Sequence, residues 1–319
     1  MRLLEVLNPG FSTTIQDHGR VGFQKYGVPA SGAMDPHSFL TANLLVGNSA
    51  NQACLEATVL GPKLRFLSET QIAITGADLS PTINHNDVRP WRTLQVRKND
   101  LLSFGHSRSG CRAYLAVKGG LNTPIVMGSR STCLRGGFGG HHGRPLKAGD
   151  VLEVGTYSRK PRPTLELPEP IVPKYTSKHE ADVILGPQDD YFTEESISKL
   201  LTSSFIISMD SDRMGYRLEG ETIQYRNSRR LISDAIPVGA VQVPEGGKPI
   251  LMMRDAQTTG GYPKIAVVLT PSIAKLGQAK PNDEIMFQQV SPIRAQKSIR
   301  DYLKFISGIK HTLRTISDQ

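Results

Sequence analysis

Short apolar or alternating segments recur along the chain, and each is closed by Gly, Pro, Asn or Asp. Segments of this kind are typical of β-strands joined by tight turns, and their regular recurrence favours sandwiches and barrels. We therefore predict an all-β fold with a minor helical content. The segments are TQIAITGA, TLQVRK, DLLSFG, AYLAVKGG and DVLEVG in the first half, and ADVILGP, SSFIISMD, AVQVP, PILMMRD, KIAVVLTP and DEIMFQQV in the second.

Two short helices are predicted between these strands. Residues 37–45 follow Asp35 and Pro36, which are a favourable capping residue and a favourable first-turn proline. The second helix, residues 193–201, starts within the sequence FTEES, whose hydroxyl and carboxylate groups suit a helix N-terminus.

The tail, residues 293–319, is predicted to be a basic amphipathic helix, because apolar residues recur in it at spacings of three and four. We expect this helix to dock in trans, on a partner protein or on a second copy. Docking against the chain's own barrel, or fraying, is the alternative. The apolar positions are Ile299, Tyr302, Ile306, Ile309, Leu313 and Ile316.

A proline-rich stretch, YSRKPRPTLELPEPIVPK, marks the predicted domain boundary. Proline removes a backbone donor and disfavours helix in the preceding residue, so the stretch is expected to be extended. A surface loop within one domain is the alternative. We predict an N-terminal domain (1–160), a linker (161–174), a C-terminal domain (175–292) and the helical tail.

Short motifs repeat between the two predicted domains. GRVGF in the first half is echoed by DRMGY in the second, and VPASGAM is echoed by IPVGAVQV. Matched glycines at matched bends favour a duplicated β-barrel. Chance similarity between turn-rich β sequences is the alternative.

The net charge of +9 is concentrated in the tail, and no nucleic-acid recognition motif accompanies it, so we expect no nucleic-acid partner. No stretch approaches the roughly 20 apolar residues of a membrane span, and the N-terminal apolar run is too short for a signal peptide. Cys54, Cys111 and Cys133 are too scattered for a disulfide framework or a cysteine-based zinc site. We expect a cytoplasmic protein that binds no membrane.

Longer motifs resemble the biotin-dependent carboxyltransferase / allophanate-hydrolase-subunit-2-like family over roughly residues 3–290. They are TTIQDHGRVGF, GVPASGAMDP, ANLLVGN and LEATVLGP, then GGLNTPIVMGSRST, and finally SDRMGYRLEG, AVQVPEGGKPI and DAQTTGGYPKIAVV. The resemblance implies two cyclophilin-like β-barrel domains in tandem, in agreement with the repeat.

The resemblance also implies an activity in a heteromeric complex. In an ATP-dependent 5-oxoprolinase, a chain of this type would be the C subunit and would work with a cyclophilin-like B subunit and a lactam-utilisation-type A subunit. The complex would use ATP with Mg to open 5-oxo-L-proline to L-glutamate, and this chain would be inactive alone.

The family leaves two alternatives open. One is biotin-dependent carboxyl transfer to urea or a similar amide. Biotin would then arrive on another protein, because the chain has no biotinylation-type Met-Lys-Met motif. The other is a non-catalytic regulator that antagonises a kinase inhibitor.

The candidate site residues lie mainly in two glycine-rich stretches, residues 10–36 and 255–265. Glycine lets backbone donors approach a ligand without interference from a Cβ, and loops at a barrel rim commonly carry function. We expect both stretches to line a cleft between the barrels. For the second stretch, a β-bulge whose polar groups satisfy their own backbone is the alternative.

Three carboxylates, Asp35, Glu56 and Asp255, are the predicted catalytic residues. The guanidinium groups of Arg20 and Arg213 suit a carboxylate or a phosphate, and structural pairing with a nearby aspartate is the alternative. The predicted substrate- or ATP-binding residues are Gln16, Asp17, Arg20, Arg213, Gln257, Thr258, Thr259, Gly260, Tyr262 and Lys264.

The stretch GGFGGHHGRP carries His141 and His142 without a nearby acidic cluster in sequence, so we predict a mobile loop and no metal site. The chain has no GxxxxGK[ST] sequence, which excludes ATP binding of the P-loop kind. It also has no nucleophile elbow.

Overall fold

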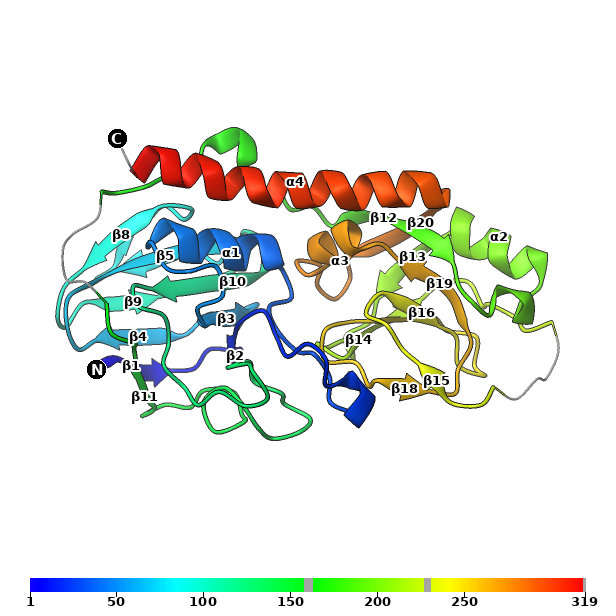
Figure 1. Ribbon diagram of the computed structural model, residues 1–319, viewed down its shortest axis with the longest axis horizontal. Helices are drawn as coiled ribbons and strands as arrows, with labels where there is room; N and C mark the ends of the chain where they lie inside the picture. Colours follow the sequence, from blue (N-terminus) through cyan, green and yellow to red (C-terminus); the bar gives the residue numbers. More distant parts are fainter. Residues whose placement is uncertain (158–162, 227–230, 318–319) are drawn as a thin grey trace. The chain divides into compact units, whose positions relative to one another are not determined.

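The computed structural model describes residues 1–157, 163–226 and 231–317, and the chain divides into two compact units (Figure 1). The first unit comprises Met1–Val21, Ser31–Tyr175 and Phe305–Gln319, and the second comprises Gly22–Ala30 and Thr176–Lys304. Both units are built mainly from β-strands, and a helix ends the chain. The predicted fold class, all-β with a minor helical content and a C-terminal helix, is confirmed.

The strands of the first unit form two sheets, in the orders β11-β1-β4-β9-β6-β7 and β2-β3-β10-β5-β8. A core of mainly aliphatic side chains from both sheets fills the space between them. The strands of the first sheet are β1 (Arg2–Asn8), β4 (Lys63–Phe66), β6 (Thr82–Ile83), β7 (Asn86–Asp87), β9 (Leu101–Ser103) and β11 (Val151–Glu153). Those of the second are β2 (Ser12–Gln16), β3 (Cys54–Thr58), β5 (Thr70–Asp78), β8 (Thr93–Val96) and β10 (Ser109–Val117).

The second sheet is buried on both faces. Leu55 and Leu115 belong to the core between the sheets, whereas their chain neighbours Cys54 and Tyr114 belong to a second core on the opposite face. This alternation follows from the two-residue period of a strand. Helix α1 (Pro36–Leu45) covers the opposite face and coincides with the helix predicted at residues 37–45.

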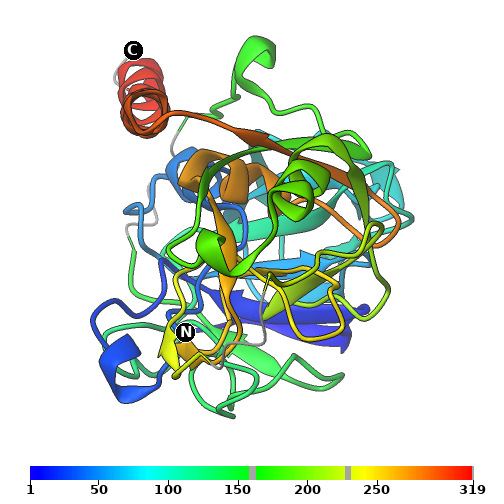
Figure 2. The ribbon, with the colours of Figure 1, turned by 90° about the vertical axis from the view of Figure 1, so that its right-hand side faces the viewer.

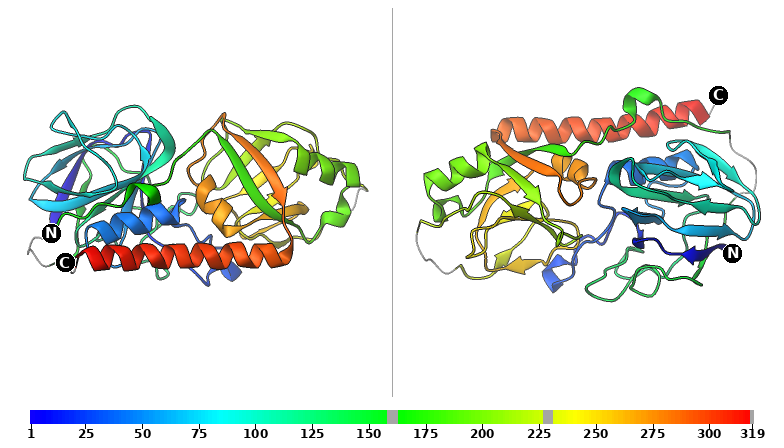
Figure 3. Two further views of the ribbon diagram at one scale, coloured as in Figure 1. Left: turned by 90° about the horizontal axis from the view of Figure 1, so that it is seen from above. Right: turned by 180° about the vertical axis from the view of Figure 1, so that it is seen from behind.

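The last turns of helix α4 (Pro292–Ser317) pack in that second core, where Ile309 and Leu313 are each 2% exposed. Figure 3 shows these turns beside α1. The expectation that this apolar stripe docks in trans is therefore wrong at Ile309 and Leu313, which dock on the chain's own first unit. The predicted stripe position Ile316 lies outside the residues whose side chains are described.

The same core also includes Leu165 and Leu167, which lie in the segment predicted to be a linker. Thr93 N donates to Leu165 O, and Leu167 N donates to Trp91 O. This part of the proline-rich segment is thus packed against the first unit. The predicted domain end at residue 160 lies outside the described residues.

The second unit is a closed barrel of seven strands, and Figure 2 shows the molecule with this unit facing the viewer. Its strands, in spatial order, are β12 (Lys178–Leu185), β19 (Lys264–Val268), β16 (Ala240–Gln242), β17 (Ile250–Met252), β14 (Gly215–Glu219), β13 (Ser204–Ile207) and β20 (Glu284–Gln289). Strands β12 and β20 are parallel and close the barrel. A separate ribbon consists of β15 (Asp234–Ala235) and β18 (Thr259–Gly260).

Helices α2 (Glu194–Thr202) and α3 (Thr270–Leu276) pack on the strands of this barrel. Thr193 caps α2 by accepting from Ser196 N at 3.1 Å, which matches the predicted N-terminus. Short 3-10 turns occur at η1 (Gln24–Tyr26), η2 (Glu169–Ile171) and η3 (Asp189–Tyr191). Within the described parts of the chain, none of the helices has the length and apolarity needed to cross a bilayer.

Candidate functional site

Most of the ionisable residues predicted to form a site are buried, so the protein must supply partners that replace water around each of them. The middle of the second glycine-rich stretch, residues 257–262, is more accessible, and Thr259 and Tyr262 are exposed. The buried candidates are Gln16, Asp17, Arg20, Asp35, Glu56, Arg213, Asp255 and Lys264.

Asp17 fastens the first glycine-rich stretch to the segment around residues 129–131. Its carboxylate accepts from Ser129 Oγ and Ser131 Oγ, both at 2.6 Å, and from Arg130 N at 2.6 Å. Gly19 N also donates to it, at 2.8 Å. These serines were missed from sequence because they lie more than 100 residues from Asp17 along the chain. The contacts give Asp17 a structural role.

Arg20 lies over the same segment. Its Nη2 donates to Ser131 O at 2.5 Å, and its guanidinium carbon is 4.9 Å from the centre of the Phe138 ring. A Cβ on Gly139 would lie 2.8 Å from Arg20 Nη2 and 2.2 Å from Ser131 O, and Gly139 has a positive φ of 72°. Glycine is therefore required at position 139 for the backbone to approach this side chain.

Glu56 lies in a polar row that crosses the second sheet of the first unit. In the strand register, Glu56 on β3 is paired with Thr14 on β2 and with Tyr114 on β10, and Tyr114 is paired with Thr75 on β5. Tyr114 Oη donates to Glu56 Oε2 at 2.7 Å, and Met34 N donates to the same oxygen at 2.9 Å. The carboxylate is thus buried and held in a fixed direction.

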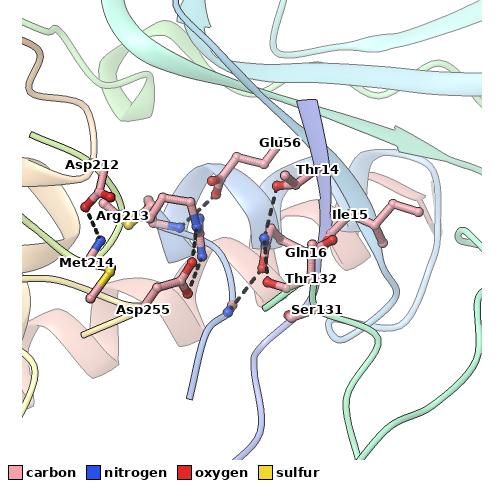
Figure 4. Close-up of polar contacts among 12 residues, drawn as sticks. Thr14, Ile15, Gln16, Glu56, Ser131, Thr132, Asp212, Arg213, Met214 and Asp255 are labelled. Carbon is pink, nitrogen blue, oxygen red and sulfur yellow. Dashed lines mark hydrogen bonds and ion pairs between the residues drawn. The ribbon is translucent and has the colours of Figure 1, made fainter. Parts of the chain in front are cut away.

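Gln16 is the neighbour of this row (Figure 4). Its Nε2 donates to Thr14 Oγ1 at 3.0 Å, and its Oε1 accepts from Gly32 N at 3.2 Å. A Cβ on Gly32 would lie 2.9 Å from His18 O, so the tight bend of the glycine-rich stretch brings a backbone donor to this amide. Gln16 therefore joins β2 to the bend at Gly32.

Asp35 is the N-cap of α1. Its carboxylate accepts from Ser38 N at 3.1 Å and from Ser38 Oγ at 2.5 Å. Tyr175 Oη lies 3.4 Å from the same carboxylate, and burial followed by the charge of Asp35 raises the pKa of Tyr175 well above its usual value. The capping bonds satisfy the first-turn donors of the helix, so Asp35 has a structural function beside any chemical one.

Arg213 and Asp255 form a buried bidentate ion pair in the second unit (Figure 4). Nε lies 2.9 Å from Oδ2, and Nη2 lies 3.1 Å from Oδ1. Pairing with an aspartate, the alternative to ligand binding, therefore occurs, but with Asp255 and not with the adjacent Asp212, which accepts from Met214 N at 2.7 Å. The acidic partner of Arg213 is therefore another predicted site residue.

Lys264 anchors the ribbon that contains Thr259 and Gly260. Its Nζ lies 2.6 Å from Asp234 Oδ2 and 3.1 Å from Ala235 O, and both acceptors belong to β15. The hydrogen bond from Lys264 lowers the pKa of Asp234. The Lys264 ammonium thus neutralises a carboxylate of its own unit.

A hollow of about 390 Å³ opens in the second unit and brings together two predicted residues, Gln257 and Tyr262. Gln242, which the sequence reasoning missed, also lines it and donates through Nε2 to Tyr262 O at 3.0 Å. The acidic and basic groups at its wall are Asp210, Asp212 and Arg217. Gln242 follows strand-like alternation in AVQVP, a pattern that predicts a strand and gives no sign of a site.

The remaining predicted residues of the second stretch lie outside the wall of this hollow. Thr259 and Gly260 form β18 and pair with β15, and Thr258 O accepts from Ile236 N at 2.9 Å. Their polar backbone groups are therefore used in pairing with β15 and Ile236, and not in the self-satisfied β-bulge that was the alternative for this stretch.

The histidine-containing loop is tied to the first unit by an ion pair. Asp150 accepts from both Nη atoms of Arg144 at 2.8 Å, and His141 Nε2 lies 3.3 Å from Asp150 Oδ1. The hydrogen bond from Arg144 lowers the pKa of Asp150, and burial lowers that of His141. Among the described residues, no group of three or more His, Cys, Asp or Glu is placed to hold a metal ion.

Several known proteins are similar to this chain over most of its length. Residues 26–289 match the family model described as carboxyltransferase domain, subdomain A and B. The 5-oxoprolinase C subunit of Escherichia coli is 37% identical over 96% of this chain and 97% of its own length. That of Haemophilus influenzae is 34% identical over 97% of this chain and 98% of its own length.

Much longer proteins match the same region. The urea amidolyase of Saccharomyces cerevisiae is 34% identical over 96% of this chain but over only 18% of its own length. The crystal structure of the Kluyveromyces lactis urea amidolyase superposes with a TM-score of 0.90 and 34% identity, covering 96% of this chain and 20% of that one. The chain thus spans nearly all of the two bacterial proteins and about a fifth of these amidolyases.

Proposed function

The chain belongs to the family of carboxyltransferase domains, subdomains A and B, and from this premise we propose that it is the C subunit of an ATP-dependent 5-oxoprolinase. In this proposal it works with a cyclophilin-like B subunit and a lactam-utilisation-type A subunit. The complex hydrolyses the amide bond of 5-oxo-L-proline to give L-glutamate and uses ATP with Mg, and this chain is inactive alone.

The extent of the match is the observation that most supports this proposal. Every large part of the Escherichia coli 5-oxoprolinase C subunit has a counterpart here, because the alignment covers 97% of that protein. In the Saccharomyces cerevisiae urea amidolyase, the counterpart is 18% of the protein, so most of that protein lies outside the similarity.

The hollow of the second unit suits an amide ligand. A lactam holds its amide in the cis form, so its C=O acceptor and its N–H donor lie on one edge. The primary carboxamide of Gln257, which lines the hollow, offers the complementary donor and acceptor. We propose that this edge of 5-oxoproline pairs with Gln257, and that the exposed Arg217 attracts the carboxylate of the same molecule.

We propose that the catalytic carboxylates are among Asp35, Glu56 and Asp255, because water must lose a proton when it adds to the lactam carbon. All three are buried and hydrogen-bonded: Asp35 caps α1, Glu56 accepts from Tyr114 Oη and Met34 N, and Asp255 pairs with Arg213. ATP-derived phosphorylation of the lactam oxygen would remove the amide resonance that opposes hydrolysis.

A biotin-dependent carboxyl transfer to urea or a similar amide is the second candidate. The TM-score of 0.90 with the Kluyveromyces lactis urea amidolyase is the observation that favours it. In this case a biotinylated protein would deliver the carboxyl group, and the carboxamide of Gln257 would pair with urea by the same donor–acceptor pattern.

Reconstitution separates the two candidates. We would co-express the chain with its proposed lactam-utilisation-type and cyclophilin-like partners and measure glutamate released from 5-oxoproline with and without ATP, in the presence and absence of avidin. ATP-dependent, avidin-insensitive release supports the first proposal, whereas avidin-sensitive carboxylation of urea supports the second. In the active complex, Gln257→Leu should raise KM for 5-oxoproline at least tenfold, while Gln296→Leu on an exposed face of α4 should leave it unchanged.

A further inference from the structure

Another hollow, of about 240 Å³, opens in the first unit at one end of its second sheet. Strands β10, β5 and β8 are neighbours in this sheet (Figure 1). In the strand register, Gln95 on β8 is paired with Gln71 on β5, and the backbone N–H of Lys118, the residue after β10, donates to Gln71 O at 2.9 Å. Polar residues from three adjacent strands or strand ends therefore line one wall of the hollow.

Lys118 brings an ammonium group to this wall. The residue is 8% exposed, and its Nζ lies 3.3 Å from Gln71 Oε1 and 5.9 Å from the centre of the Tyr157 ring. A Cβ on Gly119, which has a positive φ of 91°, would lie 2.5 Å from Tyr157 Cδ1, so glycine lets this ring lie against the backbone beside Lys118. Because the ammonium is largely shielded from water, it attracts an anion more strongly than a lysine on an open surface does.

Ser68 contributes a hydroxyl group to the same hollow. Its Oγ is buried and has no hydrogen-bond partner among the residues that the structure describes. A buried hydroxyl that makes no hydrogen bond costs free energy, so such groups usually have a partner. A ligand in the hollow would supply this partner.

The size and the charge of the hollow indicate the class of ligand. Its volume is below the range of roughly 300–1,000 Å³ that is typical of pockets for drug-sized ligands, so a nucleotide is too large. The charged side chains at its wall are those of Lys118 and of the exposed Glu69. One ammonium balances one negative charge, and Glu69 opposes a second, so a carboxylate fits better than a doubly charged phosphate.

We propose that this hollow binds a small carboxylate, whose oxygens accept hydrogen bonds from Lys118 Nζ and Ser68 Oγ. The carboxamides of Gln71 and Gln95 offer donors and acceptors to the rest of the molecule. The site is separate from the hollow of the second unit and does not depend on the proposed function. The first unit thereby has a ligand of its own.

An NMR titration of the purified chain tests the site. The probe is propionate, its neutral isostere is propionamide, and chloride keeps the ionic strength constant. Propionate should shift the backbone amide signals of Lys118 and Gln71 in a saturable way, whereas propionamide should not. The amide signals of Gln257 and Tyr262 report on the hollow of the second unit. Shifts confined to these two signals, or no saturable shift at all, would overturn the proposal.

A lysine variant tests the ammonium. Lys118→Met keeps an unbranched side chain without the charge, and it should weaken propionate binding about tenfold or more, because a charge-assisted hydrogen bond is lost. The matched control is Lys98→Met at an exposed position, which should bind as wild type does. Equal affinities of wild type and Lys118→Met would contradict the proposal. Tighter binding of inorganic phosphate than of propionate would overturn the assignment to a carboxylate.

Ser68→Ala separates a ligand-binding hydroxyl from a structural one, and it decides the question if Lys118→Met does not fold. It should weaken propionate binding about threefold or more, because one hydrogen bond is lost. Without propionate it should not lower the melting temperature, because the hydroxyl has no partner in the described part of the chain. A lower melting temperature together with an unchanged affinity would show that the hydroxyl is structural and would refute its role in the site.

Discussion

The docking of α4 on the first unit gives a stability prediction that can be worked out from the structure. Leu313 is 2% exposed in a core that also contains Leu165, Leu167 and Trp91. Burying a leucine side chain contributes about 1.5–3 kcal/mol, and the cavity left by truncation adds to the loss. Leu313→Ala should therefore lower the free energy of unfolding by about 2–5 kcal/mol.

The same helix offers a matched control. Leu303 is 57% exposed, so Leu303→Ala removes few contacts, and it should change the free energy of unfolding by less than about 0.5 kcal/mol. Both substitutions are from leucine to alanine in the helix interior, so their helix propensities cancel in the comparison.

Urea unfolding followed by tryptophan fluorescence is the appropriate assay. The chain has one tryptophan, Trp91, which is 7% exposed in the core that receives the helix. Its emission reports on the first unit alone. Equal stabilities of the Leu313→Ala and Leu303→Ala variants would refute the docking. Refutation together with a change in association on size-exclusion chromatography would instead favour docking in trans.

The remaining predictions concern buried charges, pH and one glycine. Asp255→Ala removes the carboxylate partner of buried Arg213 and should cost about 3–5 kcal/mol in chemical denaturation followed by circular dichroism, whereas Glu195→Ala breaks only the exposed pair with Lys199 and should have little effect. Burial lowers the pKa of His37 from 6.5, so the unfolded chain takes up the proton first and stability should fall as the pH drops below about 6.5. In thermal melts between pH 7 and pH 5, the melting temperature of His37→Phe should fall less with decreasing pH than that of wild type. An equal fall in both proteins would show that other groups cause the pH dependence. Gly139→Ala should destabilise the first unit more than Gly137→Ala does, since both glycines have positive φ but only the Cβ at 139 meets backbone, 2.2 Å from Ser131 O.

Local features of the fold could be predicted because the signals that specify them lie next to one another in the sequence. The alternation in AYLAVKGG predicts a strand, and β10 is that strand with its two faces in two cores. Asp35 and Thr193 cap the helices that follow them, as their side chains favour.

Partners that lie far apart in the sequence could not be predicted. Asp255 is 42 residues from Arg213, whereas Asp212, the aspartate next to Arg213 in the sequence, instead stabilises its own turn. The apolar stripe of α4 has the same period whether it packs on its own unit or on another protein, so its period says nothing about the partner.

The candidate site shows the same limit. Glu56 and Tyr114 meet through strand register, which depends on how β3 and β10 pair and not on either segment alone. Tyr114 stands in an apolar strand and has the pattern of a core residue, so its hydroxyl could be assigned only from its neighbours. Leu165 and Leu167 lie in a proline-rich segment, and their place in the core could not be predicted because their neighbours there are far away in the sequence.

The central claim, that this chain belongs to a 5-oxoproline-opening complex, is tested most directly by one reaction. The purified chain, combined with its lactam-utilisation-type and cyclophilin-like partners, should release glutamate from 5-oxo-L-proline when ATP and Mg are present, and omission of ATP or of any one protein should abolish the release. Absence of glutamate from every combination, with all three proteins folded and associated, would contradict the claim.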